Sequence, residues 1–187
     1  MKNLLKKISK TLKDLRSHRS WSLDAASEKT GVSKAMLGQI ERGESSPTIS
    51  TLWKIAKGFD VSFSSLTENL ESAKYQFLHS KKVSTKNYQG DKKIKLSTIF
   101  PYNKESGFEV FAITLLPTCH HKSAPHRKGI IEYVIVASGE IEILINDKWH
   151  SIKESEGIRF AADKPHGYRN VSKKIAIFHN IICYNEK

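Results

Sequence analysis

The stretch from residue 22 to residue 43, SLDAASEKTGVSKAMLGQIERG, decides the fold of the N-terminal third of the chain. It predicts two short helices, at about 22–30 and 34–42, that are joined at Gly31. A residue without a side chain adopts a positive φ there at little steric cost. Ser22 and Ser33 stand at the N-cap positions of the two helices, and Gly43 ends the second helix.

The second of these helices has two chemically different sides. Leu37 and Ile40 form an apolar side that we expect to face inward. The opposite side carries two cations, a small residue and an amide, namely Lys34, Ala35, Gln39 and Arg42. Base edges in a DNA major groove present donors, acceptors and thymine methyl groups, so this side suits a major groove.

The neighbouring sequence predicts a small helical bundle around this pair. Leucine and isoleucine recur at helical spacing over residues 3–18, which predicts an amphipathic first helix. After the pair, ESSPTIS forms a turn in which Thr48 or Ser50 caps a further helix, and a short final helix follows at about 62–68. The N-terminal region is therefore expected to hold five helices.

The string GVSKAMLGQIERGESSPTISTLWKIAKGF resembles the XRE, or lambda-repressor-like, helix-turn-helix family, and the resemblance extends over about residues 4–67. It implies that the second helix lies in the major groove of a double-stranded operator. It implies base or groove contacts from Ser33, Lys34, Ala35 and Gln39. It implies phosphate contacts from Ser22, Arg42, Ser45 and Thr48. It also implies a partly buried ion pair between Glu41 and Arg16.

Composition describes an ordinary globular protein with an excess of positive charge. The chain has 187 residues, of which 39% are hydrophobic and 27% charged, with a formal net charge of +12. The excess is spread over the chain, with 12 basic and 7 acidic residues before Leu70 and 19 and 12 from there on. A lysine-rich composition explains this charge as well as DNA binding does, so the charge alone does not identify a partner.

The same composition predicts a cytoplasmic protein with no membrane partner. The two cysteines, Cys119 and Cys183, are far apart in sequence and form no CxxC motif, which suits a reducing compartment. No apolar run approaches the roughly 20 residues that a membrane-spanning helix needs. Residues 1–13 lack the apolar core of a signal peptide.

Beyond a polar stretch that we interpret as a linker at 69–80, the sequence changes to short β-branched and aromatic runs. We expect strands at about 93–100, 108–116, 130–137, 141–145, 157–161 and 175–184. Tight turns such as SGE and INDKW are expected to join pairs of strands. Many short strands with regular turns predict a small barrel or jelly roll, in which closure removes exposed edges. The predicted domains are therefore 1–68 and 81–187.

The second half resembles a cupin domain. His126, Glu132 and Gly139 have the spacing of the first cupin motif in HRKGIIEYVIVASG. Pro165, His166 and Asn170 match the end of the second motif in FAADKPHGYRN. The implied fold is a two-domain α+β chain, with an all-α lambda-repressor-like domain and an all-β cupin (double-stranded β-helix, jelly-roll) barrel. Stretches such as ESSPT, TLWKIA and GIRFAAD resemble most the sulfur-utilisation regulators of enteric bacteria within the XRE-cupin group.

The cupin resemblance suggests a metal site that this sequence alters. The positions of the usual ligands fall on His126, Lys128, Glu132 and His166. The ammonium of Lys128 has no lone pair to offer a metal and would repel it. The two imidazoles and one carboxylate that remain suffice for iron or manganese if they converge. Ser155 replaces a glycine that the family often has before the second motif, so that turn is expected to differ.

The same residues are open to other interpretations. A small organic or anionic effector would find positive donors in His126, Lys128, Arg159 and His166, while Glu132 and Tyr133 would orient an amine or hydroxyl. Alternatively, these polar groups only satisfy one another. The cluster Cys119, His120 and His121 is expected in a loop, where Cys119 and His121 share a face and His120 does not.

These patterns together favour a homodimeric, sequence-specific transcription regulator whose cupin domain senses a small molecule. The sequence leaves the cofactor open between none, which it favours, and a divalent metal, and the protein is expected not to be an enzyme. The alternatives are a cupin metalloenzyme of the dioxygenase or isomerase type with an appended DNA-binding domain, and a cupin that serves only as a dimerisation scaffold. A metalloenzyme would need a metal with open coordination positions, which the Lys128 substitution argues against.

Overall fold

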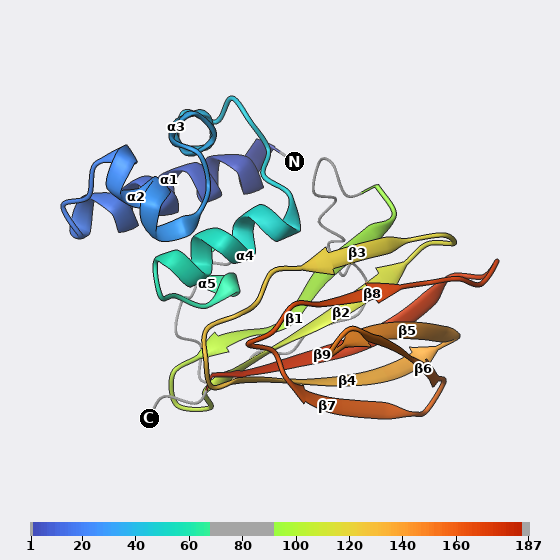
Figure 1. Cartoon of the computed structure of the whole chain (residues 1–187). Helices are drawn as coiled ribbons and strands as arrows, with labels where there is room; N and C mark the ends of the chain where they lie inside the picture. The colour runs from blue at the N-terminus through green and yellow to red at the C-terminus, as the bar shows by residue number, and fades with distance from the viewer. Residues whose placement is uncertain (1, 68–91, 185–187) are drawn as a thin grey trace. The chain divides into compact units, whose positions relative to one another are not determined.

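The computed structural model describes residues 2–67 and 92–184 (Figure 1). The chain divides into two compact units, one built of the helices and one of the strands. The linker predicted at 69–80, and with it the predicted boundaries between the domains, lies outside the described residues. The last residue of the predicted final helix, Glu68, also lies outside them.

The first unit contains the five helices that the sequence predicts, and their bounds are close to the expected ones. They are α1 (Lys2–His18), α2 (Leu23–Thr30), α3 (Lys34–Glu41), α4 (Ile49–Gly58) and α5 (Phe63–Thr67). Their apolar stripes meet in one core, in which each of the following side chains is at most 2% exposed: Ile8, Leu12, Ala26, Leu37, Ile40, Ile49, Leu52, Ile55, Phe59, Phe63 and Leu66. Burial of this core is the main force that holds short helices together.

Local capping explains where the central helices begin and end. The hydroxyl oxygens of Ser22 and Ser33 accept hydrogen bonds from the backbone N–H groups of Ala25 and Met36. Gly31 adopts φ +65°, and its N–H donates to the carbonyl of Ser27. Between the two residues that could cap α4, the structure selects Thr48, whose hydroxyl oxygen accepts from the N–H of Thr51.

One close approach within the helical unit was not predicted. Gly58 at the end of α4 lies against the end of α2, and a Cβ added there would stand 2.6 Å from the Cα atom of Thr30. No side chain fits at that distance from a backbone atom. The absence of a side chain at Gly58 therefore lets the two helices pack.

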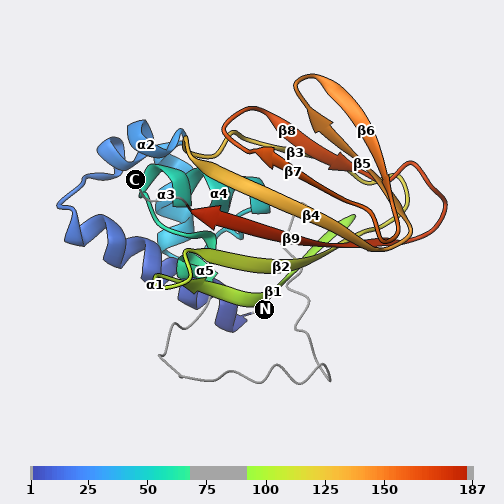
Figure 2. The same ribbon diagram turned by 90° about the horizontal axis from the view of Figure 1, so that it is seen from below.

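The second unit consists of nine described strands in two antiparallel sheets, as expected for a cupin barrel (Figure 2). The first sheet has the order β1 (Ile94–Asn103), β2 (Phe108–Leu115), β9 (Ala176–Tyr184), β4 (Ile130–Ser138) and β7 (Gly157–Ala161). The second has the order β3 (His120–Ser123), β8 (His166–Arg169), β5 (Glu140–Ile145) and β6 (Lys148–Lys153). Alternate side chains of both sheets, such as Val134, Ile143 and Phe178, are fully buried between them.

Three strands were missed, and one turn was misassigned. The segment 120–123, expected as a loop, is β3, and β6 and β8 were also not predicted. The SGE turn was expected to join a pair of strands, but the adjoining β4 and β5 belong to different sheets. Gly139 adopts φ +81° at this crossing, and a Cβ there would lie only 3.1 Å from the carbonyl oxygen of Ile175. INDKW does form the expected hairpin, with positive φ at Asn146 and Asp147.

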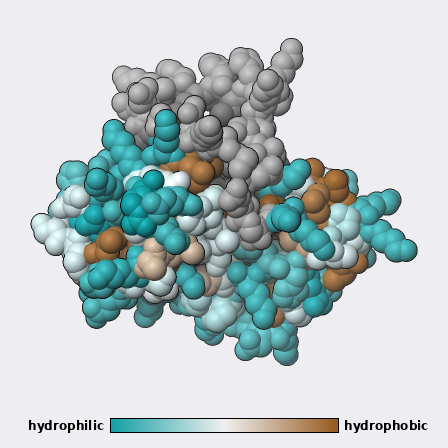
Figure 3. Space-filling view, turned by 90° about the horizontal axis from the view of Figure 1, so that it is seen from above, coloured by the Kyte–Doolittle hydropathy of each residue, from teal (hydrophilic) through white to brown (hydrophobic). Residues whose placement is uncertain are grey.

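The surface agrees with burial of the apolar residues inside each unit. Hydrophilic residues predominate on the face shown in Figure 3, where the hydrophobic patches are small and separate. In the part of the chain that the structure describes, no helix is both long and apolar enough to cross a membrane.

Candidate functional sites

The first site is the exposed side of α3. Leu37 and Ile40 are at most 1% exposed, so they anchor the inner side of the helix in the core. The residues expected at base edges, Ser33, Lys34, Ala35 and Gln39, are all exposed on the opposite side. The bundle therefore presents this side of α3 as a surface available for contact.

The residues expected to contact phosphates lie before and after this helix in the sequence. Ser22 and Thr48 cap α2 and α4, so each lies at a helix N-terminus, where the macrodipole favours a negative group. The hydroxyl of Ser45 donates to the sulfur of Met36 at 3.6 Å. Arg42 follows the last residue of α3 and is exposed.

Both cations of this surface form ion pairs with acids that the sequence analysis did not consider. The Lys34 ammonium lies 2.8 Å from a carboxylate oxygen of Asp24. The Arg42 guanidinium donates two hydrogen bonds, of 2.8 and 2.7 Å, to the Glu44 carboxylate. The hydrogen bond between them raises the pKa of Arg42 and lowers that of Glu44. A phosphate that binds either cation must compete with a carboxylate of the same domain.

The ion pair predicted between α1 and α3 is present. The Arg16 guanidinium donates to both carboxylate oxygens of Glu41, at 2.7 and 2.8 Å, and also to the carbonyl of Trp21 at 3.0 Å. The two charged side chains are only 19% and 9% exposed. The hydrogen bond that Arg16 donates to Glu41 raises the pKa of Arg16. The pair therefore fixes the end of α3 against α1.

The second site is a polar cluster inside the barrel, where the expected residues His126, Glu132 and His166 converge. All three are at most 5% exposed, and one ligand atom from each lies within 4.8 Å of the others. His126 Nε2 is 2.8 Å from Glu132 Oε1, and His166 Nε2 is 3.3 Å from the same oxygen. Donors that share a metal about 2.1 Å away stand about 3 Å apart, so these separations fit a common ion.

Two residues of the cluster were missed by the sequence analysis. The Tyr168 hydroxyl and the Asn180 amide both donate to Glu132 Oε2, the amide at 3.0 Å. They point inward from β8 and β9. Asn180 stands at a buried position that alternates with half-buried residues of β9, whereas His166, Gly167 and Tyr168 of β8 are all buried. The alternation of a strand could have found Tyr168, two residues after His166, had β8 been predicted.

The electrostatics of the cluster depend on the Glu132 carboxylate. Burial raises the pKa of Glu132, but His126 and His166 outweigh it and hold the pKa well below its usual range. Burial and the Glu132 charge raise the pKa of Tyr168 well above its usual value, so Tyr168 stays a neutral donor. Burial lowers the pKa of His166, but the carboxylate and the Lys164 carbonyl outweigh burial and raise it.

His166 is oriented so that one nitrogen remains available. Its Nδ1 lies 2.9 Å from the Lys164 carbonyl, which can only accept, so Nδ1 carries a proton. The Nε2 atom is buried and lies 3.3 Å from Glu132 Oε1 without the geometry of a hydrogen bond. Oδ1 of Asn180 is also buried and has no hydrogen-bond partner among the described residues. A buried lone pair beside a carboxylate and a second imidazole suits a divalent metal, so the donor set fits iron or manganese.

The remaining residues expected in the pocket lie elsewhere. Lys128 and Tyr133 are exposed, and Tyr133 alternates with Glu132 on β4, so it points away from the barrel interior. Arg159, also exposed, lies with its guanidinium carbon 5.9 Å from the Tyr133 ring centre. Arg159 and His166 do border one pocket, whereas Lys128 and Tyr133 do not.

The cysteine–histidine cluster and the Ser155 turn have structural explanations. Cys119 and His121 are buried and His120 is exposed, which matches the expected alternation, although the segment is a strand rather than a loop. His120 lies against Trp149 on the outside of the second sheet, with ring centres 5.4 Å apart. Ser155 adopts φ +67°, so it retains the left-handed conformation that a glycine would favour.

Known proteins match the chain in both units. The helix-turn-helix family model matches residues 12–66 and the cupin-domain model matches residues 112–182. The HTH-type transcriptional regulator SutR of Escherichia coli strain K12 is 42% identical over 184 residues, covering 98% of each chain.

Two solved structures of transcriptional regulators are also similar to this chain. An HTH_3 family transcriptional regulator from Vibrio cholerae is 43% identical with a TM-score of 0.84, covering 98% of each chain. The cupin domain of an XRE family transcriptional regulator from Enterobacter cloacae is 39% identical with a TM-score of 0.50, covering 50% of this chain and 99% of that one.

Proposed function

Because the chain belongs to the family of transcriptional regulators that join a helix-turn-helix domain to a cupin domain, we propose that α3 reads an operator in the major groove while the barrel senses a small molecule. As a DNA-binding regulator, it has to present base-reading side chains on a rigid support. The observation that carries the proposal for α3 is its exposed side, held in place by the buried Leu37 and Ile40.

In this arrangement Gln39 is the residue best suited to a base edge. Its amide can donate and accept at once, as recognition of adenine requires, while Ala35 can meet a thymine methyl group. Ser33 and Lys34 stand at the N-terminal end of the helix, the part that enters the groove first in this class of proteins. Ser22, Arg42, Ser45 and Thr48 contact phosphates and set the register.

Substitution of Gln39 tests this assignment. We expect Gln39→Ala to reduce discrimination at one base position by about 1–3 kcal/mol, because a bidentate contact is lost there. The measurement selects binding sites from a random DNA pool with each protein and then compares affinities by fluorescence anisotropy. Lys13→Ala, on the exposed side of α1, is the control. Equal weakening on all sequences would place Gln39 at the backbone instead.

The polar cluster supports a binding role for the barrel. If a metal binds, His126, Glu132 and His166 would hold it, and it would supply Lewis acidity and coordination sites for an oxygen ligand. Tyr168 and Asn180 would then orient the Glu132 carboxylate through their hydrogen bonds to its Oε2 atom. Elemental analysis of protein purified without chelator tests this: we expect bound iron or manganese to be lost in Glu132→Gln. A metal content equal in both proteins would refute the assignment.

A metalloenzyme is the alternative that this cluster favours, because two imidazoles and one carboxylate also form catalytic iron sites. We propose instead that the protein is not an enzyme, since its named relatives are regulators and the fourth ligand position of the resembled proteins is the exposed Lys128. Turnover of small organic acids with dioxygen by metal-loaded protein would overturn this proposal.

We further propose that the protein is a cytoplasmic homodimer with domains at 1–68 and 81–187 and a linker at 69–80. Ile135 and Ile177, on neighbouring strands β4 and β9, are 46% and 36% exposed and lie on the outside of the first sheet. Exposed apolar side chains on one sheet face suit an isologous contact between two copies. An effector that alters the spacing of the two α3 helices would then change operator affinity. Sedimentation velocity measures the oligomeric state directly.

A further inference from the structure

The two cations at the ends of α3 each lie beside an acid that comes from outside the helix. Lys34 is the first residue of α3, and its ammonium is 2.8 Å from Oδ2 of Asp24, in the first turn of α2. Arg42, at the C-cap of α3, donates through Nε and Nη2 to the two carboxylate oxygens of Glu44. The surface that we propose for DNA therefore carries two carboxylates among its cations.

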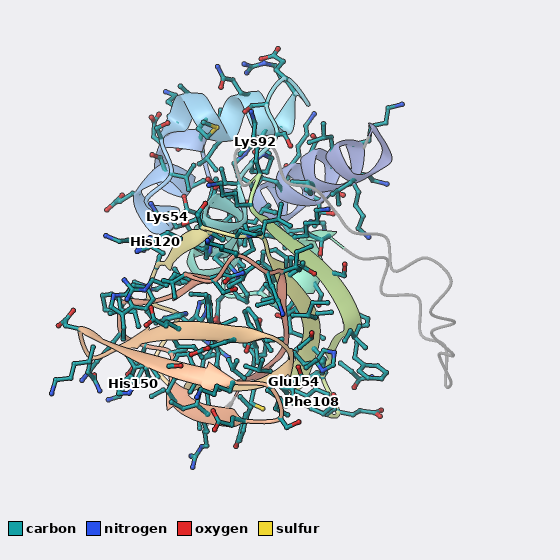
Figure 4. All side chains as sticks on the ribbon, turned by 90° about the vertical axis from the view of Figure 1, so that its right-hand side faces the viewer. Lys54, Lys92, Phe108, His120, His150 and Glu154 are labelled. Atoms are coloured by element: carbon teal, nitrogen blue, oxygen red, sulfur yellow. The ribbon has the colours of Figure 1, made fainter. Side chains whose placement is uncertain are left out.

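Such pairing is not shared by all exposed cations of the helical unit. Figure 4 shows Lys54 of α4 among the charged side chains of this unit, and Lys54 is exposed. In the ranges that the structure describes, no acid lies within ion-pair distance of Lys54. The two exposed pairs are thus found at the helix that we propose to read DNA.

The backbone at the end of α3 fixes the place of Glu44. The N–H of Glu44 donates to the carbonyl of Gln39 at 2.9 Å, and the N–H of Gly43 donates to the carbonyl of Ile40 at 3.0 Å. Gly43 adopts φ +73° between them. These features form a Schellman motif, which sets the direction of the chain after a helix. Glu44 therefore follows Arg42 in a defined geometry.

The Arg42 guanidinium lies back along α3, over a helix position that has no side chain. A Cβ added at Gly38 would stand 3.1 Å from Arg42 Nη1. Glycine inside a helix is less stable than alanine, so this position favours room for the guanidinium over helix stability. Glu44 occupies Nε and Nη2, which leaves both hydrogens of Nη1 and one of Nη2 as donors. Arg42 can therefore contact DNA while it stays paired.

Neither pair is explained by the stability of α3. A cation at a helix N-terminus and an acid beyond its C-terminus both oppose the macrodipole, and these are the positions of Lys34 and Glu44. The side chains of the two pairs are between 55% and 70% exposed, and ion pairs at such exposure contribute little to folding. The acids are better explained by what binds to this surface.

Carboxylates act differently on the two modes of DNA binding. Affinity for non-specific DNA comes from phosphates, so each acid repels the backbone and occupies a cation that would otherwise neutralise a phosphate. At an operator the paired cations still have donors for a base edge or a phosphate, and a carboxylate can accept from the amino group of cytosine. Repulsion that acts mainly against the wrong partner increases specificity.

We infer that Asp24 and Glu44 are specificity-determining residues, which weaken binding to non-specific DNA more than binding to the operator. This inference rests on the proposed function of α3 as the helix that reads DNA. It gives a role to two acids that the sequence pattern did not single out. Asp24 acts through the position and charge of Lys34, and Glu44 acts through those of Arg42.

Two substitutions of similar shape and one control test this inference. Asp24→Asn and Glu44→Gln each remove one carboxylate charge, and Asp14→Asn removes the same charge from an exposed position of α1. The wild-type full-length protein first selects a preferred duplex from a random DNA pool. Fluorescence anisotropy then measures the affinity of each protein for this duplex and for a scrambled duplex of equal length, over a range of salt concentrations.

The expected result is a loss of discrimination between the two duplexes. Asp24→Asn and Glu44→Gln should each bind the scrambled duplex roughly threefold more tightly, while affinity for the preferred duplex changes by less than about twofold. The slope of log affinity against log salt on the scrambled duplex should steepen by up to about 0.9, because a released cation neutralises one more phosphate. Asp14→Asn should change neither the discrimination nor the slope.

The other outcomes contradict the inference in different ways. Equal changes on both duplexes would show that the acids set only the overall affinity, and an equal effect of Asp14→Asn would assign the result to net charge. A preference that both variants retain in full would overturn the inference and leave the proposed function intact. If the wild-type protein selected no preferred duplex, the proposed function would fail and the inference with it. Circular dichroism detects a folding defect, and the two substitutions act independently.

Discussion

The ion pair between Arg16 and Glu41 offers the most quantitative test of how α3 is held. Glu41→Gln keeps the shape of the side chain but removes its charge. One of the two hydrogen bonds from the guanidinium is then lost, and the other is made to an uncharged oxygen. The Glu41 and Arg16 side chains are 9% and 19% exposed, so solvent screens the pair only in part. Arg16 would keep its hydrogen bond to the Trp21 carbonyl.

The magnitude follows from this geometry. Hydrogen bonds to charged groups contribute about 1.5–3 kcal/mol, and breaking a fully buried pair costs about 3–5 kcal/mol. Because one side chain is partly exposed and one hydrogen bond persists, we expect a loss of about 2 kcal/mol. For a helical domain of this size, such a loss lowers the unfolding temperature on the order of 10 °C.

Thermal unfolding of the full chain, followed by circular dichroism at the helix minimum, measures this loss. Glu44→Gln is the matched control, because Glu44 pairs with Arg42 through the same two-pronged geometry on the open surface. It should leave the unfolding temperature unchanged. If Glu41→Gln were no more harmful than Glu44→Gln, the pair would not anchor α3. A double replacement, Arg16→Met with Glu41→Leu, should recover much of the stability, because no charge is left unpaired.

Further substitutions test packing, DNA binding and assembly. Gly58→Ala should lower the free energy of unfolding by about 2 kcal/mol or more in urea denaturation, because its Cβ would stand 2.6 Å from the Thr30 Cα; unchanged stability would mean that α2 and α4 separate easily. Glu44→Gln should strengthen binding to non-specific DNA and steepen the salt dependence by about one unit, since Arg42 no longer has a competing carboxylate; an unchanged slope would show that Arg42 does not meet a phosphate. Ile135→Asp should convert the proposed dimer to monomers in sedimentation velocity, because a charge would be buried at the contact; a dimer that persists in this variant would place the interface elsewhere.

The helical unit was predictable from sequence because its signals are local. Ser22, Gly31 and Ser33 each act within a few residues of their own position, through a cap or a positive φ. Their effect does not depend on distant parts of the chain. The same is true of the Asn146–Asp147 hairpin turn, which was also predicted correctly.

The strands β3 and β8 were missed because they carry no such signal. HHKS and HGYR are four residues long and contain no β-branched side chain, so neither composition nor alternation indicates a strand. They form because β3 and β8 pair with each other as neighbouring strands of the second sheet, and β8 also pairs with β5. The energy that stabilises them comes from segments far away in sequence.

What the sequence by itself determined is the chemistry of individual positions: which helix side is apolar, which residues cap, and which two histidines and glutamate have the spacing of a cupin motif. Only the tertiary structure decided which of these side chains share a space. It brought Tyr168 and Asn180 to Glu132, placed Lys128 and Tyr133 outside, and opened a pocket at Arg159. The physical reason is that capping and alternation act over a few residues, whereas a site in a barrel is assembled by strand pairing between segments up to dozens of residues apart.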